Sequence, residues 1–117
     1  MGMDAMTLGQ RQRVFSLALA RLIIKAYEMD FEISMGDAYR DPRAFGVAGE
    51  AGPYGNDNSN HKRRLACDLN LFIDGEYITN DKGHRELGTW WEEEYGEVGA
   101  RWGGHYGDPN HYECLHV

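Results

Sequence analysis

The fold is decided by the stretch LACDLNLFIDGEYI, which spans residues 65–78. Residues 65–73 predict a strand, because its two-residue period sets Cys67, Leu69, Leu71 and Ile73 on one face and Asp68, Asn70 and Phe72 on the other. Asp74-Gly75 is a strong hairpin signal, so the residues that follow would form a returning strand. Asp68 then lies on the face opposite Cys67, Leu69 and Leu71. A carboxylate that faces away from the apolar side needs a polar or metal partner.

Helices are predicted on both sides of this hairpin. The segment from Leu8 to Met29 is rich in helix-forming residues and follows Thr7, a plausible N-cap. Its wide apolar stripe predicts packing against a sheet along much of its length. Residues 85–97 predict a second helix, and alternation at 31–35 and 111–117 predicts two further strands. The first of these strands would end near Tyr39 and Arg40. The order predicts an α+β fold, with a small and mainly antiparallel sheet packed on helices.

Length and composition indicate one domain that covers residues 1–117. The chain is 42% apolar and 26% charged, which is ordinary globular composition. Its net charge of -7 and its lack of a long basic stripe disfavour a nucleic-acid partner. Arg21 and Lys25 interrupt the one hydrophobic segment, so we expect no signal peptide and no membrane insertion. Cys67 and Cys114 are too few for a disulfide framework, and we expect a monomer made in the cytoplasm.

Glycine-rich residues 46–58 predict a long loop. Glycines recur there at every third position from Gly46 to Gly55. The segment lacks the lysine and the serine or threonine of a phosphate-binding loop, which disfavours a nucleotide site. A long loop in a small domain is usually functional or disordered, so a loop on the substrate side is the preferred interpretation.

Histidines and acids gather in two clusters, at residues 59–68 and 102–113. The first sets His61 and Asp68 seven residues apart. In the second, Asp108 and His111 are three apart across a Pro-Asn turn, and Glu113 shares a strand face with His111. Catalytic zinc is held by three such ligands with a fourth position left open. On spacing alone an ordinary ion pair between Asp68 and His111 stays an alternative.

Taken together, the clusters resemble the zinc D-Ala-D-Ala carboxypeptidases and VanY-type peptidases, especially small phage L-alanyl-D-glutamate endopeptidases. The family pattern is Ser-x-His, then Ala-x-Asp, then an acid three residues before a His that is followed by an aromatic or aliphatic residue and Glu. The resemblance covers residues 39–113. Its matching segments are Tyr39-Arg40, Ser59-x-His61, Ala66-x-Asp68-Leu69, Trp102-Gly103-Gly104 and Gly107-Asp108-Pro109-Asn110-His111-Tyr112-Glu113.

The resemblance implies a site with one zinc ion and a hedgehog/DD-peptidase-like fold. It implies that His61, Asp68 and His111 are the zinc ligands. It further implies that Asp108 is the general base and that Arg40 stabilises the oxyanion. Ser59 would hold the ligand loop or the substrate, and Glu113 would orient His111. Two positions depart from the family pattern: Arg64 stands where many members have glycine, and His105 stands where many phage members have aspartate.

The implied function is that of a phage endolysin, which cuts the L-Ala–D-Glu bond of the peptidoglycan stem peptide and acts on the cell wall after release. The near alternative is a D-Ala-D-Ala carboxypeptidase or dipeptidase with the same zinc chemistry. A zinc-stabilised binding module without catalysis is a different class, which the presence of both Asp108 and Arg40 disfavours. A metal-dependent nuclease is disfavoured by the acidic charge.

Overall fold

The structure is a computed structural model that describes residues 6–36 and 63–114. The described residues form two helices and five strands, in the order α1 (Leu8–Glu28), β1 (Glu32–Met35), β2 (Ala66–Ile73), β3 (Glu76–Tyr77), α3 (Asp81–Tyr95), β4 (Ala100–Trp102) and β5 (His111–Cys114). Two 3-10 turns, η3 (Gly96–Val98) and η4 (Gly103–Tyr106), flank β4. The predicted α+β class is confirmed.

Helix α1 forms where the sequence predicts it, with the predicted cap. The Thr7 side chain accepts a hydrogen bond from the Gln10 amide at 3.1 Å, and the Gln10 side chain accepts one from the Thr7 amide at 2.9 Å. This reciprocal capping box satisfies two amides that a helix start otherwise leaves unpaired. The helix buries Phe15, Ala18, Leu22 and Ala26, which recur every three or four residues.

The sheet is antiparallel throughout, with the strand order β1-β2-β5-β4 and β3 paired to the far end of β2. The predicted hairpin after β2 is confirmed: Asp74 and Gly75 have φ values of 51° and 79°, as a tight two-residue turn requires. Strand β5 lies between β2 and β4, and its register sets Asp68 opposite His111. Two segments far apart in the sequence therefore meet in the middle of the sheet.

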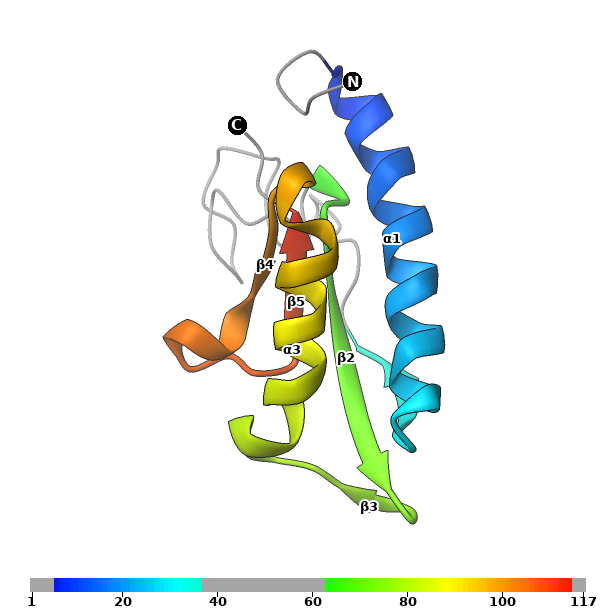
Figure 1. The fold of residues 1–117 in the computed structure, drawn as a ribbon, viewed down its shortest axis with the longest axis vertical. Helices are drawn as coiled ribbons and strands as arrows, with labels where there is room; N and C mark the ends of the chain where they lie inside the picture. Colours follow the sequence, from blue (N-terminus) through cyan, green and yellow to red (C-terminus); the bar gives the residue numbers. More distant parts are fainter. Residues whose placement is uncertain (1–5, 37–62, 115–117) are drawn as a thin grey trace, which may run out of the picture.

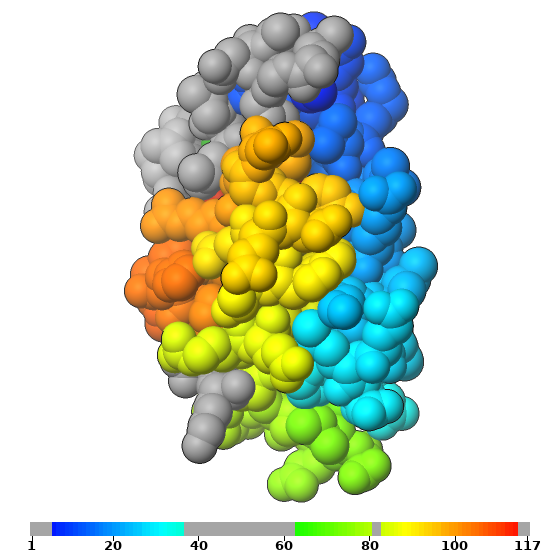
Figure 2. All heavy atoms as spheres, in the orientation of Figure 1, coloured from blue at the N-terminus to red at the C-terminus, as the bar shows by residue number. Residues whose placement is uncertain are grey.

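One face of the sheet is covered by the helices. In Figure 1 α1 and α3 lie side by side over this face, and Figure 2 shows their side chains forming a continuous surface there. The core between the layers includes Cys67, Leu69 and Leu71 of β2, packed with Trp91 of α3. Because side chains alternate along a strand, Asp68 and Asn70 point to the opposite face. The described residues include no helix with the length and apolarity needed to cross a membrane.

The structure differs from the sequence-based expectation in two elements. Helix α3 begins at Asp81, whereas the prediction began it at Arg85; the Asn80 side chain accepts a hydrogen bond from the Gly83 amide at 3.1 Å and caps this earlier start. Strand β4 was not predicted at all. It is three residues long and lies among glycines, and it is defined by pairing with β5. The ends of the predicted first and last strands lie outside the described residues.

Candidate metal centre

Three side chains converge on the face of the sheet opposite the helices. Asp68, Asp108 and His111 each offer one ligand atom, and these atoms lie within 4.8 Å of one another. His111 Nδ1 is 3.2 Å from Asp68 Oδ1 and 4.0 Å from Asp108 Oδ2. The His111 and Asp68 side chains are mostly buried, whereas that of Asp108 is 54% exposed. The site is therefore a mostly buried pair with a third, solvent-facing carboxylate beside it.

The pair is placed by strand register and the third group by a turn. Asp68 on β2 and His111 on β5 are direct cross-strand partners, so their side chains leave the sheet on the same side. Gly107 has a φ of 83° and turns the chain back after η4. The Asp108 amide then donates to the Gly103 carbonyl at 2.9 Å, and the His111 amide donates to the Asp108 carbonyl at 3.1 Å. This turn brings Asp108 over the strand end.

The Trp102-Gly103-Gly104 motif supports that turn. A Cβ on Gly103 would overlap the Asp108 carbonyl oxygen and lie 2.8 Å from His111 Cβ, so only glycine lets the two segments approach this closely. Trp102 is 1% exposed, and its indole Nε1 donates to the Pro109 carbonyl at 2.6 Å. Its backbone amide donates to Glu92 of α3 at 3.0 Å. The motif thus links the turn that carries Asp108 to the helical layer.

His111 is held from both ring nitrogens. Nε2 lies 2.9 Å from Glu113 Oε1, and because an ionised carboxylate only accepts, the nitrogen donates. Tyr106 donates to the same Glu113 oxygen at 2.8 Å. Burial alone would lower the pKa of His111, but hydrogen bonds and negative charge from Asp68 and Glu113 raise this pKa to about 9. Without a metal, the ring therefore holds a proton on Nδ1 that a metal cation would replace.

The donor set fits a zinc ion. Imidazole and carboxylate are both zinc ligands, and the unshared nitrogen of a zinc-bound histidine commonly donates to a carboxylate, as Nε2 does here. The negative charges of Asp68 and Asp108, which both lie near His111 Nδ1, would also attract a metal cation to this position. Of the predicted site residues, the structure brings together Asp68, Asp108, His111 and Glu113. The remaining three, Arg40, Ser59 and His61, lie outside the described residues.

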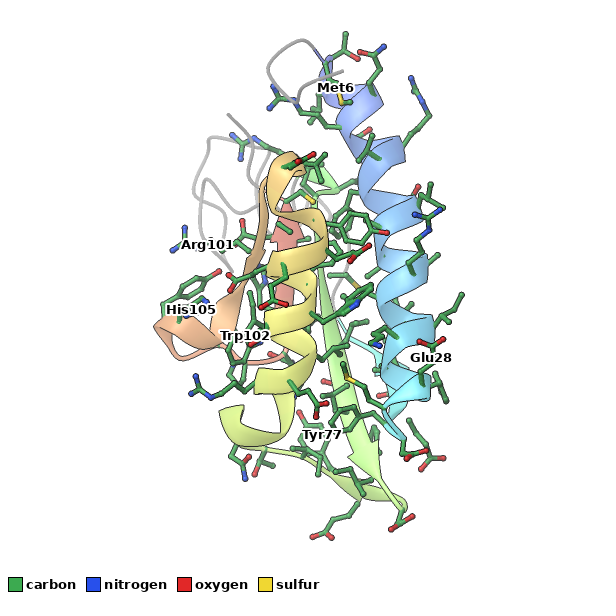
Figure 3. The ribbon with its side chains drawn as sticks, in the orientation of Figure 1. Met6, Glu28, Tyr77, Arg101, Trp102 and His105 are labelled. Carbon is green, nitrogen blue, oxygen red and sulfur yellow. The ribbon has the colours of Figure 1, made fainter. Side chains whose placement is uncertain are left out.

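Both departures from the family pattern have a structural context. Arg64 has a φ of 60°, the left-handed region that glycine adopts without strain. His105 Nε2 lies 2.7 Å from Glu92 Oε1, and its ring centroid is 5.4 Å from that of Trp102. His105 is thus engaged with α3 rather than with the triad. Figure 3 shows His105 and Trp102 together at the β4–η4 side of the molecule.

Sequence reasoning missed Tyr106. Its hydroxyl is the second donor to Glu113, and it lies at the end of η4, seven residues before its partner. Spacing alone could not reveal this contact, because it depends on the turn at Gly107 and on the pairing of β4 with β5. The aromatic residue two positions after the Gly-Gly pair was the available signal.

Comparison with known families agrees with this geometry. A family model described as D-alanyl-D-alanine carboxypeptidase matches residues 54–114, just over half of the chain, and the match contains the whole triad. A comparison with curated proteins found no match. With a helix-backed antiparallel sheet, an Asp-Asp-His cluster on the face opposite the helices and this match, the chain belongs to the D-alanyl-D-alanine carboxypeptidase family, whose members are peptidases of peptidoglycan.

Proposed function

We propose that this chain is a zinc-dependent endopeptidase that cuts the L-Ala–D-Glu bond of the peptidoglycan stem peptide and serves host lysis as a phage endolysin. The observation that carries the proposal is the Asp68–His111 pair with Asp108 beside it. In this proposal His61 joins Asp68 and His111 as the third ligand of one zinc ion.

The difference between the two aspartates supports separate roles. Asp68 is 18% exposed and 3.2 Å from His111 Nδ1, whereas Asp108 is 54% exposed and 4.0 Å from the same atom. A ligand needs a fixed position next to the other ligands, which suits Asp68. A general base must reach the incoming water and the leaving group from the open side of the site, which suits Asp108.

The chemistry divides between the ion and the side chains. A zinc ion held there supplies Lewis-acid chemistry, which makes a water more acidic and polarises the scissile carbonyl. Asp108 takes the proton of the attacking water and returns a proton to the leaving amine. Glu113 keeps the His111 ring oriented through Nε2. Arg40 is proposed to stabilise the negative oxygen of the tetrahedral intermediate, and Ser59 to hold the ligand loop or the substrate.

The choice of bond rests on the resemblance to small phage endopeptidases. A carboxypeptidase with the same chemistry releases a terminal D-alanine, whereas the proposed endopeptidase leaves L-alanine on the glycan side and a new D-glutamate amino terminus. The two products differ in mass and in the position of the free amine, so digestion of the natural substrate separates the two activities.

The test is mass spectrometry of purified peptidoglycan digested by the zinc-loaded protein. A chelated sample, the same sample with zinc restored, and the Asp108→Ala variant run beside it. We expect new D-glutamate amino termini with the zinc-loaded protein and after zinc is restored, and none in the chelated or variant samples.

Other products would change the assignment. Release of D-alanine alone would replace the endopeptidase with a carboxypeptidase. Cleavage that persists in excess chelator would refute metal dependence. Intact peptidoglycan from a protein that binds one zinc tightly would favour a binding module without catalysis.

A further inference from the structure

A third residue, Tyr106 at the end of η4, joins the contact between His111 and Glu113. The Tyr106 hydroxyl donates to Glu113 Oε1 at 2.8 Å, and His111 Nε2 lies 2.9 Å from the same oxygen. Glu113 is only 8% exposed, whereas Tyr106 is 47% exposed. Two donors from different parts of the chain therefore converge on one buried carboxylate oxygen.

Tyr106 is itself held in place. It ends η4, where the Gly107 amide closes the turn by donating to the Gly103 carbonyl. The Arg101 guanidinium carbon lies 4.8 Å from the centre of the Tyr106 ring, within the range of a cation–π contact. Arg101 is also the cross-strand partner of Glu113. Figure 3 shows Arg101 above His105 on this side of the molecule, so β4 and η4 together position the ring.

We propose that Tyr106 is a positioning residue for the metal centre: its hydroxyl fixes the Glu113 carboxylate, which in turn holds the His111 ring with Nδ1 facing Asp68 and Asp108. This inference rests on the metal site of the proposed function. A histidine binds metal through one nitrogen, and the hydrogen bond made by the other nitrogen decides which one is free. Without the hydroxyl, Glu113 Oε1 keeps its contact with His111 but loses the hydrogen bond from η4, so we expect the His111 ring to be held less firmly.

The variant that tests this is Tyr106→Phe, which removes the hydroxyl and keeps the ring beside Arg101. Tyr77→Phe is a matched control. Tyr77 is 48% exposed, and its hydroxyl likewise donates to a side chain of the sheet, in this case Asn70 of β2, at 3.5 Å. It lies on β3, opposite Phe72 near the far end of β2 from Ala66. The control therefore loses a similarly exposed hydroxyl whose partner, Asn70, is not one of the residues that hold the His111 ring.

The first measurement is a zinc titration in competition with a chromophoric chelator. Loss of a partner that orients a metal ligand typically weakens affinity by 10- to 100-fold, and Tyr106 acts one step further away, so we expect the zinc Kd of Tyr106→Phe to rise about 10-fold. The zinc Kd of Tyr77→Phe should equal that of the unmodified protein. Thermal melts of the metal-free variants check that neither substitution unfolds the chain.

The second measurement is specific to orientation. In the zinc-loaded protein, the His111 Nε2 proton should be observed by NMR and exchange slowly with water. In zinc-loaded Tyr106→Phe the same proton should exchange faster, while Tyr77→Phe leaves its exchange rate unchanged. A role of Tyr106 confined to general stability would not change the exchange rate of this one proton selectively.

Two outcomes would overturn the inference while the proposed function stands: zinc affinity and Nε2 proton exchange in Tyr106→Phe that match the unmodified protein, or equal weakening in both phenylalanine variants. An unmodified protein with no zinc affinity would overturn the metal site itself, and the inference with it.

Discussion

His84 and His111 are both buried, and they lie on opposite faces of the same sheet. His84 belongs to α3 and contacts the hydroxyl of Tyr112 through Nδ1 at 3.2 Å. His111 is the residue before Tyr112 on β5, so its ring leaves the opposite side of the strand, between Asp68 and Glu113. One strand thus separates a histidine in the core from a histidine at the candidate metal centre.

Their pKa values move in opposite directions. Burial lowers the pKa of His84 to about 4, only partly offset by a hydrogen bond to the Ile78 backbone. Burial also acts to lower the pKa of His111, yet its two carboxylate partners raise that pKa to about 9. Burial alone therefore does not set the charge of a histidine. Hydrogen-bond and charge partners also contribute, and of these two histidines only His111 lies between carboxylates that could hold a metal cation in place of its proton.

The largest expected difference between the two histidines is in zinc binding. His111→Gln should remove measurable zinc binding and bring peptidase activity to background, because it removes a proposed ligand. His84→Gln keeps a hydrogen-bonding side chain in the core and should retain the zinc affinity of the unmodified protein. Chelator-competition titrations measure both, with circular dichroism as the check on folding. Equal loss of zinc in the two variants would remove the distinction drawn here.

The next expected effect distinguishes Asp108, the proposed general base, from the proposed zinc ligands. Asp108→Asn keeps the shape of the side chain but cannot take a proton, so kcat/KM on peptidoglycan fragments should fall by about 100- to 10,000-fold. Zinc affinity should change only slightly, because Asp108 is the exposed member of the triad. Steady-state kinetics and a zinc titration on the same preparation test this. Loss of zinc in Asp108→Asn would make Asp108 a ligand.

The free energy of unfolding should depend on pH through the titration of both histidines. His84 has a folded-state pKa of about 4, below its ordinary 6.5, so its contribution is present above pH 6.5 and is lost as pH falls toward 4. His111 has a folded-state pKa of about 9, so in metal-free protein its contribution is present below pH 6.5 and is lost as pH rises through 9. Each shift corresponds to roughly 3 kcal/mol of unfolding free energy.

Urea denaturation of chelated protein across this pH range is the measurement. The sum of these two contributions to the free energy of unfolding should be largest near pH 6.5, the pKa of both histidines in the unfolded chain. His84→Gln should flatten the acidic limb and His111→Gln the alkaline limb. Unchanged limbs in the two variants would contradict the assignment of these slopes.

A smaller effect is expected from the turn that carries Asp108. Gly103→Ala places a methyl group against the Asp108 carbonyl and 2.8 Å from His111 Cβ, so it should destabilise the fold by about 1–3 kcal/mol. Zinc affinity should fall as well, since the turn must shift. Gly96→Ala is the control, because its backbone is helical and no atom lies within 4 Å of the added methyl. Urea denaturation and zinc titration compare the two, and equal behaviour would mean that the turn tolerates the shift.

The sequence predicted the elements that depend on local pattern. Helix α1 follows from its apolar periodicity and Thr7 cap, and β2 with its hairpin follows from alternation and Asp74-Gly75. The separation of Asp68 from the apolar face of β2 was also predictable, because it needs only the two-residue period of a strand. In each case the deciding interactions lie within a few residues of one another.

What the sequence did not predict depends on contacts between distant segments. Strand β4 has three residues and exists through its pairing with β5. The position of Tyr106 depends on that pairing and on the turn at Gly107, so its link to Glu113 has no signature in spacing. The early start of α3 is different, because it depends on a local contact, the hydrogen bond from the Gly83 amide to the Asn80 side chain.

The place of β5 between β2 and β4 has a consequence for the order of folding. Hairpins such as β2–β3 close quickly because their ends are near, whereas pairing β2 with β5 closes a loop of more than thirty residues and carries a larger entropic cost. Asp68 meets His111 only when that late pairing forms. A partly folded chain with α1 and the first hairpin in place would therefore have no pocket for an ion, and hydrolytic capacity would arise together with closure of the sheet.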